Sequence, residues 1–540
     1  MTRNRRTATV VTALALVAAL AGCAPGAPAA PHVESGELPG TDVIALAGDE
    51  VGPAVERAVE QLPGIVEHTL DALEVPGAAV AVVQGGDTVY EGGFGVRLSG
   101  EPDPIDPETV FQIASLSKPL SATVVAKAVT DGIVEWETPV STLMPDFALS
   151  DEYVTRTATI GDFFTHRSGL YTGAGDDLED IGFDRATILD RLRLQPLDSF
   201  RSSYHYSNFG ITAGAESVAT AADTSWEHLA DELIFEPVGM SATSARYEDL
   251  LARDNRAHLH TMIDGEIVPG PERNPDPQAP AGGVSSNVID LAEWMKMLLA
   301  DGAISGQEHI APSALLPAVS AHSISSQTAS ASQRPAHYGY GFNVGSQPGG
   351  RVTLGHSGAF VLGAGTSFQA IPDLDLGIVV LTNAGPIGAA ESIIAEFLDV
   401  VQFGEATRDW MEVFGAMAAQ YYQPVGDLVG ETAPGDAEPS LPLDAYAGVY
   451  HNPYFGDLTV RVEPSGLVAA LGPDGGYMLP LEPWGDNVFS FAPTGENAPP
   501  GSLSSASFTA EDGTTTSVTL DFFDAQGLGT WTRNAGGASE

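Results

Sequence analysis

Two groups of strand-like segments stand far apart in the sequence, and this separation is what most constrains the fold. Apolar and β-branched residues along 78–84 and 88–94, joined through a glycine-containing turn, predict a strand pair. Strand-like runs return only much later, at residues 351–354, 365–371 and 376–382, and helical patterns fill much of the sequence between. We therefore expect an α/β (α+β) fold, with one antiparallel sheet assembled from both ends of this region and flanked by helices.

The sequence changes in character after this region. Residues 52–405 contain the strand and helix patterns just described and form the predicted main domain, and a helix and an acidic, proline-rich linker are expected over residues 406–440. Short alternating runs separated by turns then predict a small all-β barrel or sandwich over residues 441–540. This last region has no cluster of titratable residues that suggests catalysis, so we interpret it as a structural or gating domain.

Charge and cysteine content exclude several classes of partner and site. The 540 residues include 23 lysines and arginines against 71 aspartates and glutamates, a net charge of −48 at pH 7. Such a charge argues against a nucleic-acid partner and against attraction to an acidic membrane surface, and is typical of a solvated protein surface. The single cysteine excludes an internal disulfide and a cysteine-rich zinc site.

The amino terminus has the pattern of an export signal. Three arginines precede an apolar run at residues 8–20, which is shorter than the ~20 residues that a spanning helix needs, so we predict a signal peptide over residues 1–22. The run ends in a segment that resembles the bacterial lipobox, with the only cysteine, Cys23, at the lipidated position. An ordinary cleavage site with a chance cysteine is the alternative. We expect residues 23–51 to be a lipidated, flexible tether that holds the mature protein to the cell membrane outside the cytoplasm.

Ser115 and Lys118 are the first candidates for catalytic chemistry. An apolar stripe over residues 120–129 predicts a helix, and Pro119 is tolerated only in a first helical turn, so this helix must begin close to Ser115. Residues three positions apart share one helix face, which lets the lysine amine approach the serine hydroxyl and take its proton. The N–H groups at the helix start suit a developing oxyanion. A surface helix start with an ordinary lysine is the alternative for this motif taken alone.

Tyr206 and Asn208 form a second motif, in a loop-like segment before a small-residue helix expected at residues 211–220. A tyrosine can relay a proton if a nearby cation lowers its pKa, and the asparagine amide can hold a substrate carbonyl. The alternative is an aromatic loop that packs on the core.

His356 and Gly358 form a third motif, directly after the strand predicted at residues 351–354. Glycine permits a close backbone approach at a strand end, and histidine can hydrogen-bond the site. His337 begins a similar histidine–glycine pattern, and we favour His356 because it continues a strand and has another strand beyond it.

The order and spacing of the three motifs resemble the serine β-lactamase and penicillin-binding-protein superfamily, in particular its class C-like β-lactamase-related hydrolases. Further segments at residues 165–170, 280–284 and 338–342 resemble a His-x-Ser-Gly-Leu turn, a glycine pair and an aromatic–glycine strand of that branch. The resemblance covers about residues 55–400. The C-terminal region is similar to the lipocalin-like barrel modules appended to some members.

This resemblance implies a role for each motif. Ser115 would be the acylated nucleophile, with Lys118 and Tyr206 sharing the acid and base duties, and Asn208 would bind the substrate amide or carbonyl. The backbone N–H groups of Ser115 and Ala359 would form the oxyanion hole.

His356 and Gly358 would contact substrate in the same family scheme. His356 stands where many members have lysine and where D-aminopeptidase-like and some esterase-like members have histidine. His166 is expected to brace a turn. No metal or organic cofactor is implied.

Two functions from different classes remain open from the sequence. The first is an extracytoplasmic serine hydrolase that cleaves an amide or ester in a small peptide, ester or β-lactam-like substrate; peptidase, esterase, β-lactamase and D,D-carboxypeptidase activities are not separated, because pocket shape decides the substrate. The second is a non-catalytic surface receptor for cell-wall peptides or β-lactams. The intact Ser115, Lys118 and Tyr206 favour the enzyme.

Overall fold

The computed structural model describes residues 46, 48–328, 330, 334–347, 350–435 and 437–533. The predicted signal peptide, Cys23 and most of the predicted tether therefore lie outside the described residues. Among the described residues, no helix combines the length and the apolar character needed to cross a membrane.

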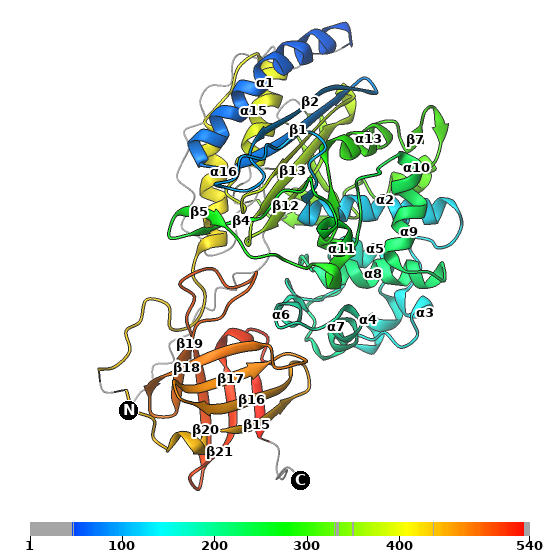
Figure 1. Cartoon of the computed structure of the whole chain (residues 1–540). Helices are drawn as coiled ribbons and strands as arrows, with labels where there is room; N and C mark the ends of the chain where they lie inside the picture. The colour runs from blue at the N-terminus through cyan, green and yellow to red at the C-terminus, as the bar shows by residue number, and fades with distance from the viewer. Residues whose placement is uncertain are drawn as a thin grey trace.

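An eight-stranded antiparallel sheet forms the centre of the main domain, in the order β2-β1-β14-β13-β12-β11-β10-β9 (Figure 1). β1 lies between β2 and β14, and Val80 faces Val380 across the pairing, so the two ends of the region do join as expected. The bounds are β1 Gly77–Gln84, β2 Asp87–Gly95, β9 Ser323–Ser326, β10 Ala336–Tyr338, β11 Asn343–Ser346, β12 Val352–Phe360, β13 Ala364–Ile371 and β14 Leu376–Thr382.

Both faces of the sheet are covered by helices, which explains why β1 and β14 are apolar at nearly every position. Along β1, Ala78 and Val80 pack into one cluster with α1 (Val51–Leu73) and α15 (Ala389–Phe403). Ala79 and Ala81 point the other way, into the larger cluster that includes α2 (Ser117–Thr130), α8 (Asn208–Ala221) and α13 (Val288–Leu299). Figure 1 shows α1 and α15 on one side of the sheet, with α16 (Trp410–Ala418) beside α15, and helices such as α2, α8 and α13 on the opposite side.

The helical layer on the other face of the sheet contains many helices, because most of the sequence between β2 and β9 belongs to it. Its helices are α2 Ser117–Thr130, α3 Val140–Leu143, α4 Glu152–Thr157, α5 Ile160–Phe164, α6 Asp176–Asp180, α7 Arg185–Arg191, α8 Asn208–Ala221, α9 Trp226–Ala230, α10 Glu236–Val238, α11 Tyr247–Leu251, α12 Ala279–Gly282, α13 Val288–Leu299 and α14 Pro312–Leu315. Three short strand pairs accompany them: β3 Phe111–Gln112 with β6 Ser285–Ser286, β4 His260–Ile263 with β5 Glu266–Pro269, and β7 Ala303–Ile304 with β8 Gln307–Glu308.

The C-terminal region is a closed eight-stranded barrel below the main domain in Figure 1, reached through α16 (Trp410–Ala418) and a 3₁₀ turn (Ala419–Tyr422). Aromatic rings fill its interior; Phe455 stacks on Trp531 and Phe489 meets Phe508 edge to face. The strands are β15 Gly448–Asn452, β16 Gly456–Glu463, β17 Gly466–Leu471, β18 Tyr477–Gly485, β19 Val488–Phe491, β20 Ser504–Glu511, β21 Thr514–Leu520 and β22 Thr530–Arg533. The predicted fold class, a helix-flanked antiparallel sheet followed by an all-β barrel, is thus confirmed.

Candidate active site

Ser115 lies on a short 3₁₀ turn (Ala114–Leu116) that leads directly into α2, beside strands β12 and β13. The preceding residue, Ala114, has a φ of +47°, a left-handed conformation that costs a non-glycine residue energy and is common at functional sites. Pro119 falls in the first turn of α2, where its missing N–H costs nothing. The local sequence therefore presents the Ser115 side chain at the start of a helix, as expected.

Lys118 is completely buried and its Nζ atom reaches three oxygen atoms. These are Ser115 Oγ at 2.9 Å, Asn208 Oδ1 at 2.8 Å and the carbonyl oxygen of Ala281 at 2.8 Å. Burial lowers the pKa of Lys118 well below its usual range, and the charge of Asp176 opposes this only in part. A neutral Lys118 donates to two of these oxygens, Asn208 Oδ1 and Ala281 O, and directs its lone pair at the Ser115 hydroxyl, so it can accept the serine proton.

Asn208 is the first residue of α8, three positions earlier than the helix start expected from the sequence. Ser207 caps this helix, because its Oγ accepts a hydrogen bond from Gly210 N at 3.0 Å, a signal that the apolar pattern alone does not show. The Asn208 amide is held from both ends: Oδ1 accepts from Lys118, and Nδ2 donates to Asp176 Oδ2 at 3.1 Å. Asn208 therefore presents a fixed orientation to the site.

Tyr206 lies against Lys118, whose Nζ is 4.6 Å from the centre of the tyrosine ring. Its hydroxyl faces Ser115 but lacks hydrogen-bond geometry there, and it has no other partner among the described residues. The condition named above, a cation that lowers the pKa of Tyr206, is not met here, because burial raises this pKa well above its usual value. The hydroxyl is thus a protonated, unpaired donor aimed into the site, a geometry that commonly tightens only when substrate binds.

His356 lies inside β12, which continues to Phe360, rather than after the end of a strand as expected. Gly355 and Gly358 hide this extension, because glycine is depleted in strands. Nδ1 lies 2.7 Å from the carbonyl oxygen of Ser357 and so carries the proton, while Nε2 accepts from the Tyr338 hydroxyl at 2.8 Å. Burial, with Lys118 as a second cause, lowers the pKa of His356 to about 3, so the ring is neutral at physiological pH and both its nitrogens are engaged within the protein.

Gly358 allows β12 to approach the serine turn closely. A Cβ atom at Gly358 would lie 2.3 Å from the carbonyl oxygen of Ile113 and 3.1 Å from Ser115 N, so any larger residue would push the strand away. The next residue, Ala359, pairs with Gly365 of β13. The structure therefore brings β12 beside the Ser115 backbone, where the predicted oxyanion donors are Ser115 N–H and Ala359 N–H.

His166 braces the segment that carries Tyr206, as expected. Its Nδ1 accepts a hydrogen bond from Ser207 N at 3.1 Å, and its ring packs 4.5 Å from the Tyr206 ring and 4.9 Å from that of Tyr338. Burial lowers its pKa well below the usual value, so this histidine stays neutral.

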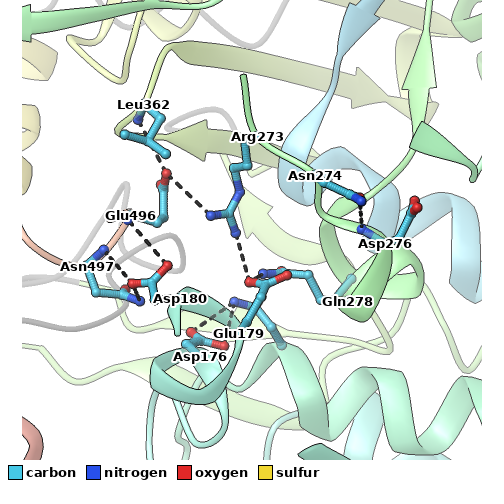
Figure 2. A network of polar contacts seen from close by, with 12 residues as sticks. Asp176, Glu179, Asp180, Arg273, Asn274, Asp276, Gln278, Leu362, Glu496 and Asn497 are labelled. Carbon is cyan, nitrogen blue, oxygen red and sulfur yellow. Dashed lines mark hydrogen bonds and ion pairs between the residues drawn. The ribbon is translucent and has the colours of Figure 1, made fainter. Parts of the chain in front are cut away.

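The acidic helix α6 is a part of the site that the sequence analysis missed. Asp176, at its start, is buried beside Asn208, and burial raises its pKa to about 7. Glu179 and Asp180, one turn further on, contact Arg273 and the barrel, respectively (Figure 2). The run of acids from 176 to 180 is visible in the sequence, but it is also what a solvated helix looks like. Among the described residues, no group of histidine, cysteine, aspartate or glutamate side chains is placed to hold a metal ion.

A buried serine–lysine pair at a helix start, beside the antiparallel sheet, is the arrangement of the serine β-lactamase and penicillin-binding-protein superfamily. The chain belongs to this superfamily: the Beta-lactamase family matches residues 57–399. A second match, to a domain of unknown function (DUF3471), covers residues 432–531 and thus the barrel. Members of the superfamily are serine hydrolases, which supports a general hydrolase activity for the chain.

Individual relatives are moderately similar to the chain. The unguisins hydrolase ungD' of Aspergillus campestris is 28% identical over 422 residues, which cover 73% of this chain and 76% of the relative. Penicillin-binding protein 4 of Amycolatopsis lactamdurans is 30% identical over 256 residues, 44% of this chain and 64% of the relative.

Two solved structures share the fold. The octameric penicillin-binding protein homologue from Pyrococcus abyssi has a TM-score of 0.56 and 21% identity, with 86% of this chain and 98% of that chain covered. A class C beta lactamase from Rhodobacter sphaeroides has a TM-score of 0.52 and 19% identity, with 65% of this chain and 99% of that chain covered.

Proposed function

We propose that the protein is an extracytoplasmic, lipid-anchored serine hydrolase that cleaves an amide or ester bond through an acyl-enzyme on Ser115. The observation that carries this proposal is the 2.9 Å contact between Lys118 Nζ and Ser115 Oγ in a buried pocket that favours the neutral amine. A serine hydroxyl is a weak nucleophile alone, and a neutral amine at hydrogen-bond distance activates it. Ser115→Ala with an acylating probe tests the proposal, because the variant has no Ser115 hydroxyl to acylate.

The proposed reaction uses only groups already placed in the site. Lys118 accepts the proton of Ser115 as Oγ bonds to the substrate carbonyl carbon, and the carbonyl oxygen becomes an oxyanion at the N–H groups of Ser115 and Ala359. The carbonyl re-forms as the bond to the leaving group breaks, and Tyr206 gives that group its proton and recovers one from Lys118. Water then attacks the acyl carbon and loses a proton to the same groups. The bond from that carbon to Ser115 Oγ breaks, and the proton passes on to Ser115 Oγ, which releases the acid and restores the serine hydroxyl.

For the substrate, we propose uncharged short-chain esters, or amides with a free D-amino end, in preference to penicillins. His356 is neutral and offers no fixed positive charge to a substrate carboxylate. The acidic helix α6 lies behind Asn208, and the chain carries a net charge of −48, so an anionic substrate meets repulsion, although salt screens it beyond about 8–10 Å. The D-aminopeptidase-like and esterase-like branch is proposed on the same histidine.

We expect a p-nitrophenyl ester or a D-alanine anilide to have a higher kcat/KM than a chromogenic cephalosporin. His356→Lys should shift the balance toward the carboxylate-bearing cephalosporin, because a lysine supplies the missing cation. Steady-state kinetics with the three substrates measure both effects, and His337→Lys, on strand β10 of the same sheet, is the matched control for added charge. A wild-type preference for the cephalosporin would overturn this use of His356.

The lipid anchor is proposed from Cys23, the only cysteine, at the end of the apolar N-terminal run. Cys23→Ser should move the protein, expressed with its signal in a bacterial host, from the detergent phase to the aqueous phase of a Triton X-114 partition, because a serine cannot take the lipid. Equal aqueous partitioning of both forms would contradict the anchor.

A further inference from the structure

One loop of the barrel reaches the catalytic strand. It connects β19 to β20, and the carboxylate of its Glu496 accepts two backbone hydrogen bonds from the turn between β12 and β13. Val361 N donates to Glu496 Oε1 at 2.6 Å, and Leu362 N donates to Oε2 at 3.3 Å. The Glu496 side chain is only 14% exposed, so these contacts are largely shielded from water. The barrel thus holds, by two backbone hydrogen bonds to a buried carboxyl group, the turn that ends the strand carrying His356, Gly358 and Ala359.

The loop is itself held by the main domain. Asp180 of α6 accepts hydrogen bonds from Glu496 N at 3.3 Å, from Asn497 N at 3.2 Å and from Asn497 Nδ2 at 2.8 Å (Figure 2). The barrel and the main domain therefore each contribute a carboxyl group that accepts hydrogen bonds from backbone N–H groups of the other domain. This reciprocal arrangement fixes the position of Glu496 relative to α6, and α6 also carries the Asp176 that orients Asn208.

Arg273 links the barrel loop to α6 by forming ion pairs with both Glu496 and Glu179. Figure 2 shows Arg273 between Glu179 and Glu496. Its guanidinium nitrogens lie 3.0 Å from a Glu179 carboxylate oxygen and 3.7 Å from one of Glu496. The guanidinium also lies 4.4 Å from the centre of the Phe360 ring at the end of β12. It is 8% exposed, and it offsets part of the charge of the acids around it. Gln278 adds a hydrogen bond to Glu179. The polar network therefore runs from the barrel loop through Arg273 to α6, with β12 in contact at one end.

On one side of β12, strand pairing stops before the catalytic end of the strand. β11 pairs with β12 only over Val352–Gly355, and the last pair is Gly355 with Asn343. Beyond that limit, the described pairing of β12 is with β13 alone, up to Phe360 opposite Ala364. Ala359 stands two residues before Val361, so a displacement of the turn moves the Ala359 N–H relative to Ser115 N. A shift of about 1 Å in such a group can cost on the order of 10²-fold in rate.

We propose that Glu496 is a positioning residue of the hydrolase, which sets the oxyanion-hole N–H of Ala359 by holding the β12–β13 turn from the barrel domain. This inference rests on the proposed function. The sequence alone indicates a structural or gating role for the barrel. The inference gives the barrel a defined part in the chemistry of the main domain.

The test compares Glu496→Ala, Glu496→Gln and Tyr454→Phe in the full-length protein. Tyr454→Phe is the matched control, because it removes another hydrogen bond of the same junction, from Tyr454 Oη to Asp177 Oδ1 at 3.0 Å, without touching β12. The readouts are kcat and KM for a p-nitrophenyl ester, the rate of Ser115 labelling by a fluorophosphonate, the affinity for a boronic acid that forms a tetrahedral adduct, and thermal unfolding.

Glu496→Ala is expected to lower kcat, the labelling rate and boronic acid affinity by about 10- to 100-fold, with KM changed less than about threefold, because an oxyanion donor acts on the tetrahedral state. Glu496→Gln should fall between, since its amide oxygen still accepts one N–H, and Tyr454→Phe should stay within about twofold of the wild type. The inference is overturned if Glu496→Ala is labelled at the wild-type rate, or if it and Tyr454→Phe lose activity in parallel with a lowered unfolding temperature. A wild-type protein that fluorophosphonate does not label at Ser115 overturns the proposed function instead.

Discussion

Ser115→Ala is expected to abolish covalent labelling by a fluorophosphonate or penicillin probe and to lower kcat/KM for any turned-over ester by about 10³-fold or more, as loss of a serine nucleophile does elsewhere. The reason is geometric: Ser115 Oγ is the hydroxyl 2.9 Å from the buried Lys118 amine. Intact-mass measurement should show one adduct on the wild-type protein, and peptide mapping should place it on Ser115.

Ser121→Ala is the matched control for this experiment. Ser121 is buried like Ser115 and lies nearby in the first half of α2, but its hydroxyl donates to the carbonyl oxygen of Pro280 rather than to a base. Its loss should leave labelling intact and lower stability by about 1 kcal/mol. An adduct that persists in Ser115→Ala would show that another group is the nucleophile. A wild-type protein that binds penicillin without acylation would favour the receptor.

The residues around Ser115 could be predicted in two ways. Some are close in the sequence, and the others belong to motifs whose order and spacing resemble those of a known superfamily. Ser115 and Lys118 are one helical turn apart, so a single helix start fixes their geometry. The hairpin near the start of the main domain is likewise a pattern of a few residues. These could be predicted because local periodicity and turn chemistry determine them.

The acidic junction could not be predicted, because its contacts join distant parts of the sequence. Glu179 pairs with Arg273, 94 residues further along the chain, and Asp180 accepts a hydrogen bond from Asn497 of the barrel loop. A carboxylate in such a run looks solvated until burial is known, yet burial raises the pKa of Glu179 to about 7. The predicted strand at residues 351–354 ends too early for a different reason. Glycines within β12 weaken the local strand pattern, and the pairing with β13 that extends β12 to Phe360 does not show in that pattern.

Lys118→Met is expected to lower the rate of Ser115 labelling and kcat/KM by about 10²- to 10⁴-fold, the usual contribution of a positioned base. Methionine fills a similar volume but cannot accept a proton, and it leaves Asn208 Oδ1 and the carbonyl oxygen of Ala281 without their donor. Lys127→Met is the matched control on the same helix, because Lys127 makes only a partly exposed ion pair with Asp131. That variant should keep the wild-type rate and change stability by less than about 1 kcal/mol.

The pH profile separates the loss of a base from a loss of fold. Burial holds the pKa of Lys118 well below its usual range and that of Tyr206 well above, so wild-type kcat/KM should rise as Lys118 loses its proton and then stay level to about pH 9. His356, with a pKa of about 3, contributes no step near neutral pH. In Lys118→Met the rising limb should disappear while thermal unfolding still shows a cooperative transition. If the variant folds, keeps more than a tenth of the wild-type rate and shows the same rising limb, the proton acceptor of Ser115 is a group other than Lys118.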